Sequence, residues 1–360
     1  MDSTALPGLP PPPPLGASAL PTGTYDGSLV LVTGGGTGLG RAIAAEFARL
    51  GADLLIVSRR ERHLAAARAE LARLGTRVTT AVCDIRDPKR ISEVYDGSAL
   101  PDVLVNNAAA NFPVPTEDMS PNAWQAVVDI TLTGTFLMTR EFGRRHLTAG
   151  TPGSVIDVGA SYAWTGGPGF AHSAAAKAGV ESLVRTLAVE WGPYGIQVNG
   201  LVPGLMPHED MTDDIRGNLA RAAARAATTD SGDNRGSGGS RDGGDGRGSG
   251  DSGGSGDGRD SGSSEDGRGG GGNGHNEGSA DDRNGPGGAE PRAHDLRQPA
   301  LRVGAPRELG WAATFLASPY ARFITGHTLV VDGANWQRRE LVGPPVTTVR
   351  DQLGRGPFTG

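Results

Sequence analysis

A glycine-rich segment near the N-terminus constrains the fold more than any other feature. It reads TGGGTGLG over residues 33–40 and lies between the apolar run Leu29 to Val32 and a helical pattern that extends to about Leu50. Glycines at a strand-to-helix turn let the backbone approach a phosphate, and the helix N-terminus supplies N–H donors and a positive dipole. We therefore expect a strand, a turn and a helix that together bind a pyrophosphate. The expected contacts are Gly34, Gly36, Thr37, Gly38, Leu39 and Gly40.

Short apolar runs alternate with helical patterns along the rest of the chain. Further strands are expected at 53–57, 78–83, 103–106, 154–158, 196–201 and 328–331, and helices at 61–74, 122–146, 173–191, 211–227 and 307–316. Short apolar strands separated by helices form a parallel sheet that is buried on both faces. Right-handed crossovers then give a doubly wound sheet, so we expect an α/β, Rossmann-like fold.

Low-complexity segments divide the chain. Residues 1–22 are Pro-rich and should form a disordered tail. Residues 228–295 are mostly Gly, Ser, Asp, Arg and Asn. This composition cannot bury enough apolar area to offset chain entropy, so it predicts a long disordered insert. The expected single domain thus has two parts, 23–227 and 296–335, and a solvated C-terminal tail follows at 336–360.

Charge, hydropathy and cysteine content exclude several classes of function. The net charge of -6 and the lack of a basic stripe argue against nucleic-acid binding. No apolar run reaches ~18 residues, so no membrane span is expected. The single cysteine, Cys83, cannot form an internal disulfide and fits a cytoplasmic protein. Lys89 and Lys177 are the only lysines in an arginine-rich chain, which marks Lys177, inside a motif discussed below, as a candidate functional residue.

The end of the second expected strand favours NADP(H). It carries Ser58-Arg59-Arg60, where an NAD site usually has an acidic residue for the ribose hydroxyl. A hydroxyl and a guanidinium suit a 2′-phosphate instead, although Arg59 could also be a solvated charge at a helix start. Asp84, after the third strand, is placed to meet the adenine, or else to cap the helix that follows.

Together with the glycine segment, three later motifs resemble the short-chain dehydrogenase/reductase family. They are Asn106-Asn107-Ala108-Ala109, Pro203-Gly204 and Val331-Asp332-Gly333. The resemblance covers about residues 25–214 and 300–335. It implies that Asn107, Pro203 and Gly204 lie at the cofactor and that the protein is a homo-oligomer, a dimer or a tetramer.

The chain departs from this family at its usual catalytic residues. Ser173 stands where a Tyr is expected, Ala160 where a Ser is expected, and Thr131 where a helix Asn is expected, so that only Lys177 of the set is kept. The pKa of a serine hydroxyl is far too high for it to replace a phenol as an acid near neutral pH. We therefore do not expect an ordinary alcohol dehydrogenase.

One branch of the family, the 2,4-dienoyl-CoA reductases, is similar to this chain at the altered positions too. Its members have a Tyr fifteen residues before the Lys, where Tyr162 stands, a Ser at the position of Ser173 and an Asn at that of Asn111. The resemblance implies an acyl-CoA substrate and two donors, Tyr162 and Asn111, that stabilise an enolate oxygen. Lys177 would then hold the nicotinamide ribose, with Ser173 beside it.

Other interpretations remain open from the sequence. His172-Ser173 also resembles the trans-2-enoyl-CoA reductases, and Tyr162 could serve as the acid of another carbonyl reductase. Loss of the usual Tyr would also fit a catalytically silent NADP(H)-binding protein. At the level of residues, Tyr162 could be a packing residue, Asn111 a turn residue, Ser173 a helix N-cap and Lys177 a surface residue.

Overall fold

Parallel strands form the centre of the described chain. A seven-stranded sheet has the order β3-β2-β1-β4-β5-β6-β7 in the described residues, and every neighbouring pair is parallel. The strands are β1 (Leu29–Thr33), β2 (Asp53–Ser58), β3 (Val78–Val82), β4 (Val103–Asn106), β5 (Gly153–Val158), β6 (Ile196–Pro203) and β7 (Thr328–Val331). The order runs outward from β1 in both directions, which confirms the predicted doubly wound α/β sheet.

The computed structural model describes residues 9–208, 298–337 and 348–355, which all belong to one compact unit. Its helices are α1 (Gly38–Arg49), α2 (Glu61–Ala72), α3 (Pro88–Asp96), α4 (Pro121–Val128), α5 (Gly134–Ala149), α6 (Tyr162–Thr165), α7 (Ala171–Trp191), α9 (Pro306–Ala317) and α10 (Val349–Gln352). The expected helix at 211–227 and the expected insert at 228–295 lie outside the described residues. Within the described part, we find no helix with the length and apolar character to cross a membrane.

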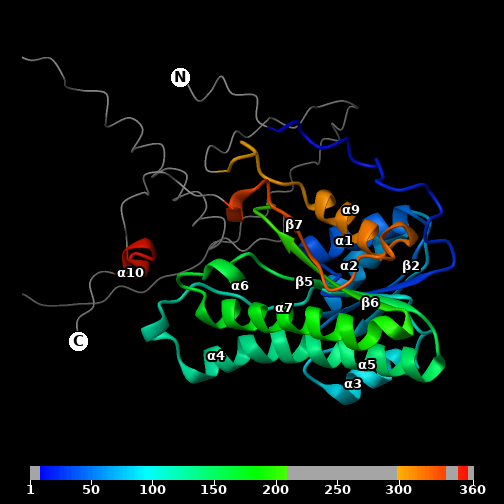
Figure 1. The fold of residues 1–360 in the computed structure, drawn as a ribbon, viewed down its shortest axis with the longest axis horizontal. Coiled ribbons are helices and arrows are strands. Elements are labelled where there is room, and N and C mark those ends of the chain that lie inside the picture. The colour runs from blue at the N-terminus through cyan, green and yellow to red at the C-terminus, as the bar shows by residue number, and fades with distance from the viewer. Residues whose placement is uncertain (1–8, 209–297, 338–347, 356–360) are drawn as a thin grey trace, which may run out of the picture. The chain divides into compact units, whose positions relative to one another are not determined.

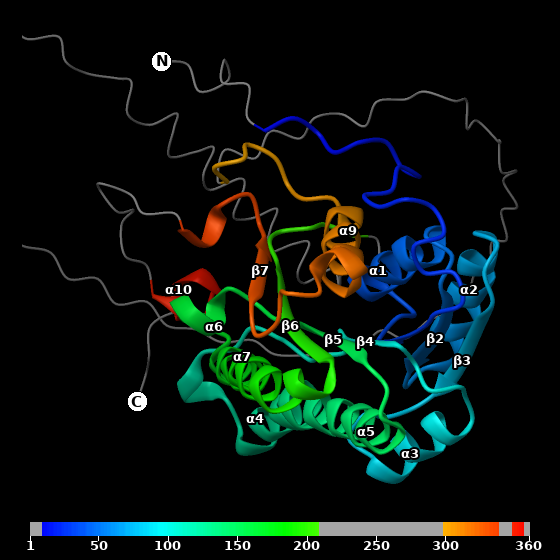
Figure 2. The ribbon, with the colours of Figure 1, turned by 45° about the vertical axis from the view of Figure 1, so that its right-hand side comes forward.

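Each face of the sheet packs against its own set of helices (Figures 1 and 2). One face is covered by α1, α2 and α9, and the other by α3, α5 and α7. Successive residues of β1 point to opposite faces, so Val30 and Val32 join the first core and Leu31 joins the second. This double burial explains why the strands are almost wholly apolar.

The helix expected at 122–146 is not a regular α-helix. It consists of α4, a π-helical turn at Asp129–Thr133, and α5. A π turn inserts an extra residue into the helix, and such turns occur often at functional sites. Periodicity alone could not show it, because its backbone continues the helical path on both sides.

The hydrophobic pattern of the sequence did not place helix α3, which entered only as the segment that Asp84 could cap. Asp87 caps it by accepting hydrogen bonds from the backbone N–H groups of Lys89 and Arg90, at 3.0 and 3.2 Å. The alternative that Asp84 caps this helix is therefore wrong. Asp84 instead accepts from the backbone N–H and the guanidinium of Arg86.

The N-terminal Pro-rich segment makes more contacts than its composition suggested. Residues 9–17 follow the segment that leads into α9 and α9 itself, and their carbonyls accept hydrogen bonds from its side chains. The donors are Arg302 Nε, Arg307 Nε and Trp311 Nε1, and the acceptors, in the same order, are the carbonyls of Pro10, Pro13 and Ala17, at 3.0, 3.2 and 3.0 Å. The expectation of a disordered tail does not hold for residues 9–17. Their prolines have no N–H to donate, and side chains of the domain donate hydrogen bonds to their carbonyls instead.

Part of the C-terminal segment also contacts the domain. The guanidinium of Arg350 lies 3.1 Å from the carboxylate of Asp118, and that of Arg355 lies 3.0 Å from it. Val349, from α10, and Leu353, directly after it, lie beside Gly169 in the segment before α7. The expectation of a solvated tail is therefore wrong for residues 348–355, because charge pairs and apolar contacts hold this turn near the start of α7.

Candidate active site

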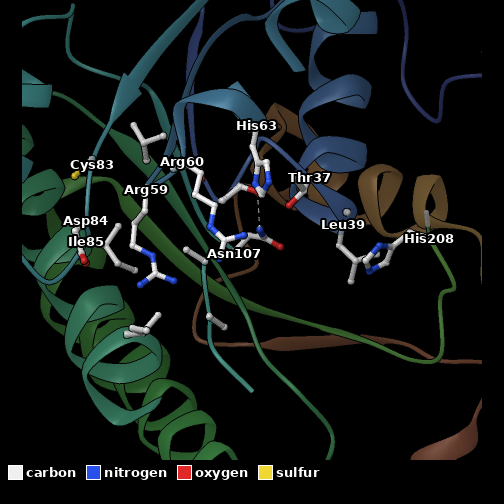
Figure 3. A pocket seen from close by; sticks show the side chains of 17 residues that line it. Thr37, Leu39, Arg59, Arg60, His63, Cys83, Asp84, Ile85, Asn107 and His208 are labelled. Atoms are coloured by element: carbon white, nitrogen blue, oxygen red, sulfur yellow. Dashed lines mark hydrogen bonds between the residues drawn. The ribbon is translucent and has the colours of Figure 1, made fainter. Parts of the chain in front are cut away.

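A cleft of about 370 Å³ opens at the carboxyl ends of β1, β2, β3 and β4 (Figure 3). The strand order reverses between β1 and β4, and such a switch point is where α/β sheets bind ligands. Many of the predicted cofactor residues line this cleft, namely Gly34, Thr37, Gly38, Leu39, Ser58, Arg59, Asp84 and Asn107. The chain thus brings these motifs to one place although they are spread over about 70 residues of sequence.

The glycine turn has no room for side chains. Gly34 has a φ of +65°, and a Cβ there would lie 2.9 Å from Nδ2 in the side chain of Asn107. A Cβ on Gly40 would lie 2.5 Å from the carbonyl oxygen of Gly34. Asn107 in turn donates from Nδ2 to the carbonyl of Thr33, at 3.1 Å. The turn is therefore a fixed backbone cradle at the N-terminus of α1, as anion binding requires.

Positive charge gathers where β2 ends. Figure 3 shows the exposed side chains of Arg59 and Arg60 directed into the cleft, with the Asp84 carboxylate at the Arg59 end. Asp84 is engaged by Arg86, whose Nη2 lies 2.6 Å from its Oδ2, and this hydrogen bond lowers the pKa of the carboxyl. A ligand that bears a phosphate near Arg59 would meet two guanidiniums.

Sequence reasoning missed several cleft residues. Arg60, His63 and His208 line it together with the predicted set. His208 lies at the Leu39 end, and its Cε1 would be 2.9 Å from a Cβ on Gly38. Arg60 could have been predicted because it adjoins Arg59. No local signal links His208 to a turn about 170 residues earlier in the chain.

Five predicted cofactor positions do not line the cleft, namely Gly36, Gly40, Lys177, Pro203 and Gly204. Gly36 faces His63, whose Cβ would lie 3.1 Å from a Cβ on Gly36. Pro203 pairs with Val331 in the sheet, and Gly204 donates its N–H to the carbonyl of Val331 at 2.9 Å. Pro203 and Gly204 therefore extend the pairing between β6 and β7, and the chain continues from them to His208.

The predicted catalytic side chains meet beyond β4 and β5. The Tyr162 hydroxyl, at the start of α6, lies 3.0 Å from the Ser173 hydroxyl on α7. Asn111, in the loop after β4, donates from Nδ2 to the same tyrosine oxygen at 3.4 Å. Burial raises the pKa of Tyr162, and the Ser173 hydrogen bond partly offsets this. The phenol is therefore a neutral hydrogen-bond donor near pH 7.

The π turn positions the loop that carries Asn111. Thr131, inside this turn, is fully buried, and its hydroxyl accepts from the backbone N–H of Ala110 at 3.2 Å. The same hydroxyl approaches the Ala110 carbonyl at 3.4 Å. Thr131 thus holds the residue that precedes Asn111, at a position that the sequence marked only as a departure from the family pattern.

Lys177 lies inside the protein. It is 6% exposed, and its ammonium donates to the carbonyl of Val158 at the end of β5. Burial lowers the pKa of Lys177 to about 8, and the charge of Asp157 opposes this shift. The alternative of a surface lysine is therefore wrong, because α7 turns this side chain toward the sheet.

Ser173 is also more than a helix cap. α7 begins at Ala171, after Phe170, so Ser173 is the third residue of the helix and its side chain does not cap it. Tyr162 stacks on Phe170, with ring centroids 6.2 Å apart, so it packs as well as bonds. Asn111 donates to Tyr162 and not only to its own turn. This arrangement can present two hydrogen-bond donors to one oxygen atom of a ligand.

Comparison with known families agrees with the fold. The short chain dehydrogenase family matches residues 28–220, which is more than half of the chain. A second family, described as enoyl-(acyl carrier protein) reductase, matches residues 285–334.

Individual relatives narrow the comparison. A Caenorhabditis elegans protein named "Probable 2,4-dienoyl-CoA reductase [(3E)-enoyl-CoA-producing]" is 43% identical over 195 residues, covering 51% of this chain and 62% of that protein. A Bacillus subtilis protein named "Probable 2,4-dienoyl-CoA reductase [(2E)-enoyl-CoA-producing]" is 39% identical over 180 residues, covering 49% of this chain and 71% of that protein. The matched segments thus span about two thirds of each relative.

A solved structure gives the same answer for the fold. The gluconate 5-dehydrogenase of Burkholderia cenocepacia, in complex with NADP and tartrate, superposes with a TM-score of 0.63 at 25% identity. The superposition covers 88% of this chain and 98% of that one. With its doubly wound sheet, its glycine turn and a family match over residues 28–220, this chain belongs to the short chain dehydrogenase family.

Proposed function

We propose that the protein is an oxidoreductase that uses NADPH to reduce a conjugated acyl-CoA thioester, a 2,4-dienoyl-CoA. The observation that carries this proposal is the convergence of Asn111 and Ser173 on the Tyr162 hydroxyl, at 3.4 and 3.0 Å. A dienoyl thioester needs two donors at its carbonyl oxygen rather than an acid that protonates an alkoxide. Relatives named as 2,4-dienoyl-CoA reductases support the same substrate class.

The residues of the cleft fit the proposed cofactor. A Cβ at Gly34 or Gly40 would collide with the Asn107 side chain and so distort the turn at which a pyrophosphate is expected. Arg59 and Arg60 line the same cleft beside Ser58 and suit the 2′-phosphate that distinguishes NADPH from NADH. Lys177 and Asn107 complete the proposed cofactor contacts, with Lys177 at the nicotinamide ribose.

The proposed reaction divides the work between the cofactor and the protein. When bound, NADPH supplies a hydride, which adds to C5 of the dienoyl chain and places negative charge on the thioester oxygen. Tyr162 and Asn111 donate hydrogen bonds to that oxygen and stabilise the dienolate. A proton then adds to C2 to give a 3-enoyl thioester, or to C4 to give a 2-enoyl thioester. Because the phenol has a single proton and donates it to the substrate, Ser173 donates its own hydroxyl proton to the Tyr162 oxygen and so orients the phenol.

A trans-2-enoyl thioester is a second candidate substrate. The match of residues 285–334 to a family described as enoyl-(acyl carrier protein) reductase favours it. The same two donors would stabilise its enolate, so the geometry serves both reactions.

The test compares three substrates with purified full-length protein. NADPH oxidation is followed with 2,4-hexadienoyl-CoA, trans-2-hexenoyl-CoA and acetoacetyl-CoA, and the product is identified by mass and double-bond position. We expect turnover of the dienoyl ester well above the other two. A preference for the enoyl ester would transfer the assignment to the second candidate.

Two other outcomes would contradict the proposal. Turnover of the ketone alone would mean that Tyr162 acts as an acid on a carbonyl, so that the oxyanion role is wrong. Tight NADPH binding without turnover of any substrate would indicate a catalytically silent binding protein. NADH, used at the same concentration, is the matched control for the role of Arg59 and Arg60.

A further inference from the structure

A buried carboxylate lies directly beneath the proposed active site. Asp157, near the end of β5, is 1% exposed and precedes Val158, whose carbonyl accepts from Lys177. Its Oδ1 accepts a hydrogen bond of 2.8 Å from Nδ2 of Asn106, and the same amide donates to the Thr139 hydroxyl at 2.7 Å. Its Oδ2 has no hydrogen-bond partner among the described residues.

Two other buried carboxylates, those of Glu46 and Glu141, are neutralised by ion pairs in a way that Asp157 is not. Glu46 is paired with Arg49, at 3.3 Å, and Glu141 with Arg144 and Arg145, at 2.6 and 2.7 Å. Asp157 has no ion pair of this kind in the described residues, and an amide is its hydrogen-bond donor. A buried carboxylate with one unsatisfied oxygen is costly unless an opposite charge is near.

The opposite charge is Lys177. It is the only lysine or arginine whose side chain is buried in the described part of the chain, and its ammonium bonds the residue next to Asp157. The two charges attract each other through the protein interior, where the effective dielectric constant is low and water does not screen them. Each of these buried charges thus makes the other less costly.

We propose that Asp157 is a positioning residue, the buried counter-charge that keeps the Lys177 ammonium charged and held against the end of β5. This inference rests on the proposed role of Lys177 at the nicotinamide ribose. Asp157 reaches the reaction only through Lys177, and the lysine must carry its charge to donate hydrogen bonds in that role.

Several elements surround the Asp157 carboxylate. Asn106 faces it from β4, while Lys177 and Glu181 act on it from α7. The Glu181 carboxylate, one helical turn beyond Lys177, accepts from the Thr328 hydroxyl and from Arg185, at 2.8 and 3.0 Å. Asn106 carries no charge and Glu181 repels the carboxylate, so Lys177 is the cation that acts on it.

The coupling predicts two steps in a titration. Burial raises the pKa of Asp157 to about 7, and the Asn106 hydrogen bond and Lys177 oppose the rise. Under this proposal Lys177, with its pKa lowered by burial to about 8, keeps its proton until Asp157 has lost its own. As the pH rises, the carboxylate therefore forms first and holds the ammonium, which is then lost on the alkaline side.

The chain offers a direct measurement because it has only two lysines. Lys89 is exposed on α3 and Lys177 is buried, so labelling lysine with ¹³C at Cε gives one signal from each. The Cε shift of each lysine is followed against pH in the full-length protein without substrate, in the wild type, in Asp157→Asn and in Glu181→Gln. Lys89 is the internal reference, and Glu181→Gln controls for the loss of any nearby carboxylate.

We expect the Lys177 midpoint to move down by about one pH unit in Asp157→Asn and by less than half of that in Glu181→Gln, because an opposite charge raises the pKa of an ammonium. The Lys89 midpoint should stay unchanged in both variants. The alkaline limb of kcat/KM should move with the Lys177 midpoint.

An unchanged Lys177 midpoint in Asp157→Asn would overturn the inference. If that variant does not fold, the wild-type curve decides. The Lys177 signal should then show a second inflection below its own midpoint, caused by the Asp157 carboxyl, and a single inflection would count against the coupling. Both readouts are free of substrate, so they can succeed or fail independently of the dienoyl-CoA assignment.

Discussion

The cleft lined by Arg59 and the candidate catalytic site around Tyr162 use charge in opposite ways. Arg59 and Arg60 stand exposed at the end of β2, where water screens them and each can be lost without leaving a buried partner. Lys177 and Asp157 are only 6% and 1% exposed, so water screens neither charge. Removing an exposed charge should therefore change cofactor affinity by a modest amount. Removing a buried charge also changes the protonation state of its buried partner and where that partner is held.

The largest effect should come from the catalytic side. Replacing Tyr162 by Phe keeps the stacking on Phe170 but removes one of the two donors at the substrate oxygen. We expect kcat for the dienoyl ester to fall by about two to three powers of ten, as for loss of an oxyanion-hole donor. Steady-state kinetics measure this, with the exposed Tyr194→Phe as the control that should keep the wild-type rate. A Tyr162→Phe rate within threefold of wild type would remove this hydroxyl from the mechanism.

On the cleft side, Arg59→Ala should weaken NADPH binding by about ten- to a hundredfold, because a charge-assisted hydrogen bond contributes about 1.5–3 kcal/mol. NADH affinity should stay close to that of the wild type, since NADH lacks the 2′-phosphate. Fluorescence titration of both nucleotides measures the change. Arg62→Ala, an exposed arginine outside the cleft lining, is the control. Equal losses for NADPH and NADH would show that Arg59 does not recognise this phosphate.

The buried lysine should give the enzyme an alkaline limit. Because the pKa of Lys177 is lowered to about 8, the ammonium is charged below that pH and is lost above it. We expect kcat/KM to fall by about tenfold for each pH unit above this value. A pH profile of kcat/KM tests this. A flat profile to pH 10 would mean that the Lys177 charge is not needed.

The smallest effect concerns Asp84. Its pair with Arg86 is partly exposed, and such pairs contribute about 0.2–1 kcal/mol. Arg86→Ala should therefore leave NADPH affinity within about fivefold of wild type while it frees the Asp84 carboxylate for the adenine. A loss of tenfold or more would show that Arg86 itself binds the nucleotide. The loss of an exposed charge in the cleft would then have a larger effect than its contrast with the buried charges predicts.

Much of the fold was predictable because its signals are local. Short apolar runs gave strands such as β4 and β5 at the expected positions, and the glycine turn placed the start of α1. Sequence reasoning overlooked α3, although Asp87-Pro88 is a local signal for the start of a helix. The π turn around Thr131 has no such signal, because it depends on which backbone groups pair within a continuous helical path.

The candidate site divides in the same way. Arg59 and Ser58 were predicted because they end a strand next to the glycine turn, and Tyr162 and Lys177 because their spacing resembles a known branch of the family. His208 and Asp157 were not predicted. Each acts on residues brought near it only by the packing of strands and helices that are far apart in sequence.

The sequence by itself determined the doubly wound sheet, the position of the glycine turn at which a phosphate is expected, and the identity of the candidate catalytic side chains. These follow from hydrophobic periodicity, from the glycines and from residue chemistry, which are properties of short segments. Only the tertiary structure decided that Ser173 and Asn111 both form a hydrogen bond with the hydroxyl oxygen of Tyr162. It also decided that Lys177 and Asp157 are both buried from water. The distances between side chains and their burial from water are set when the helices and strands pack together. They therefore cannot be predicted from any single segment of the chain.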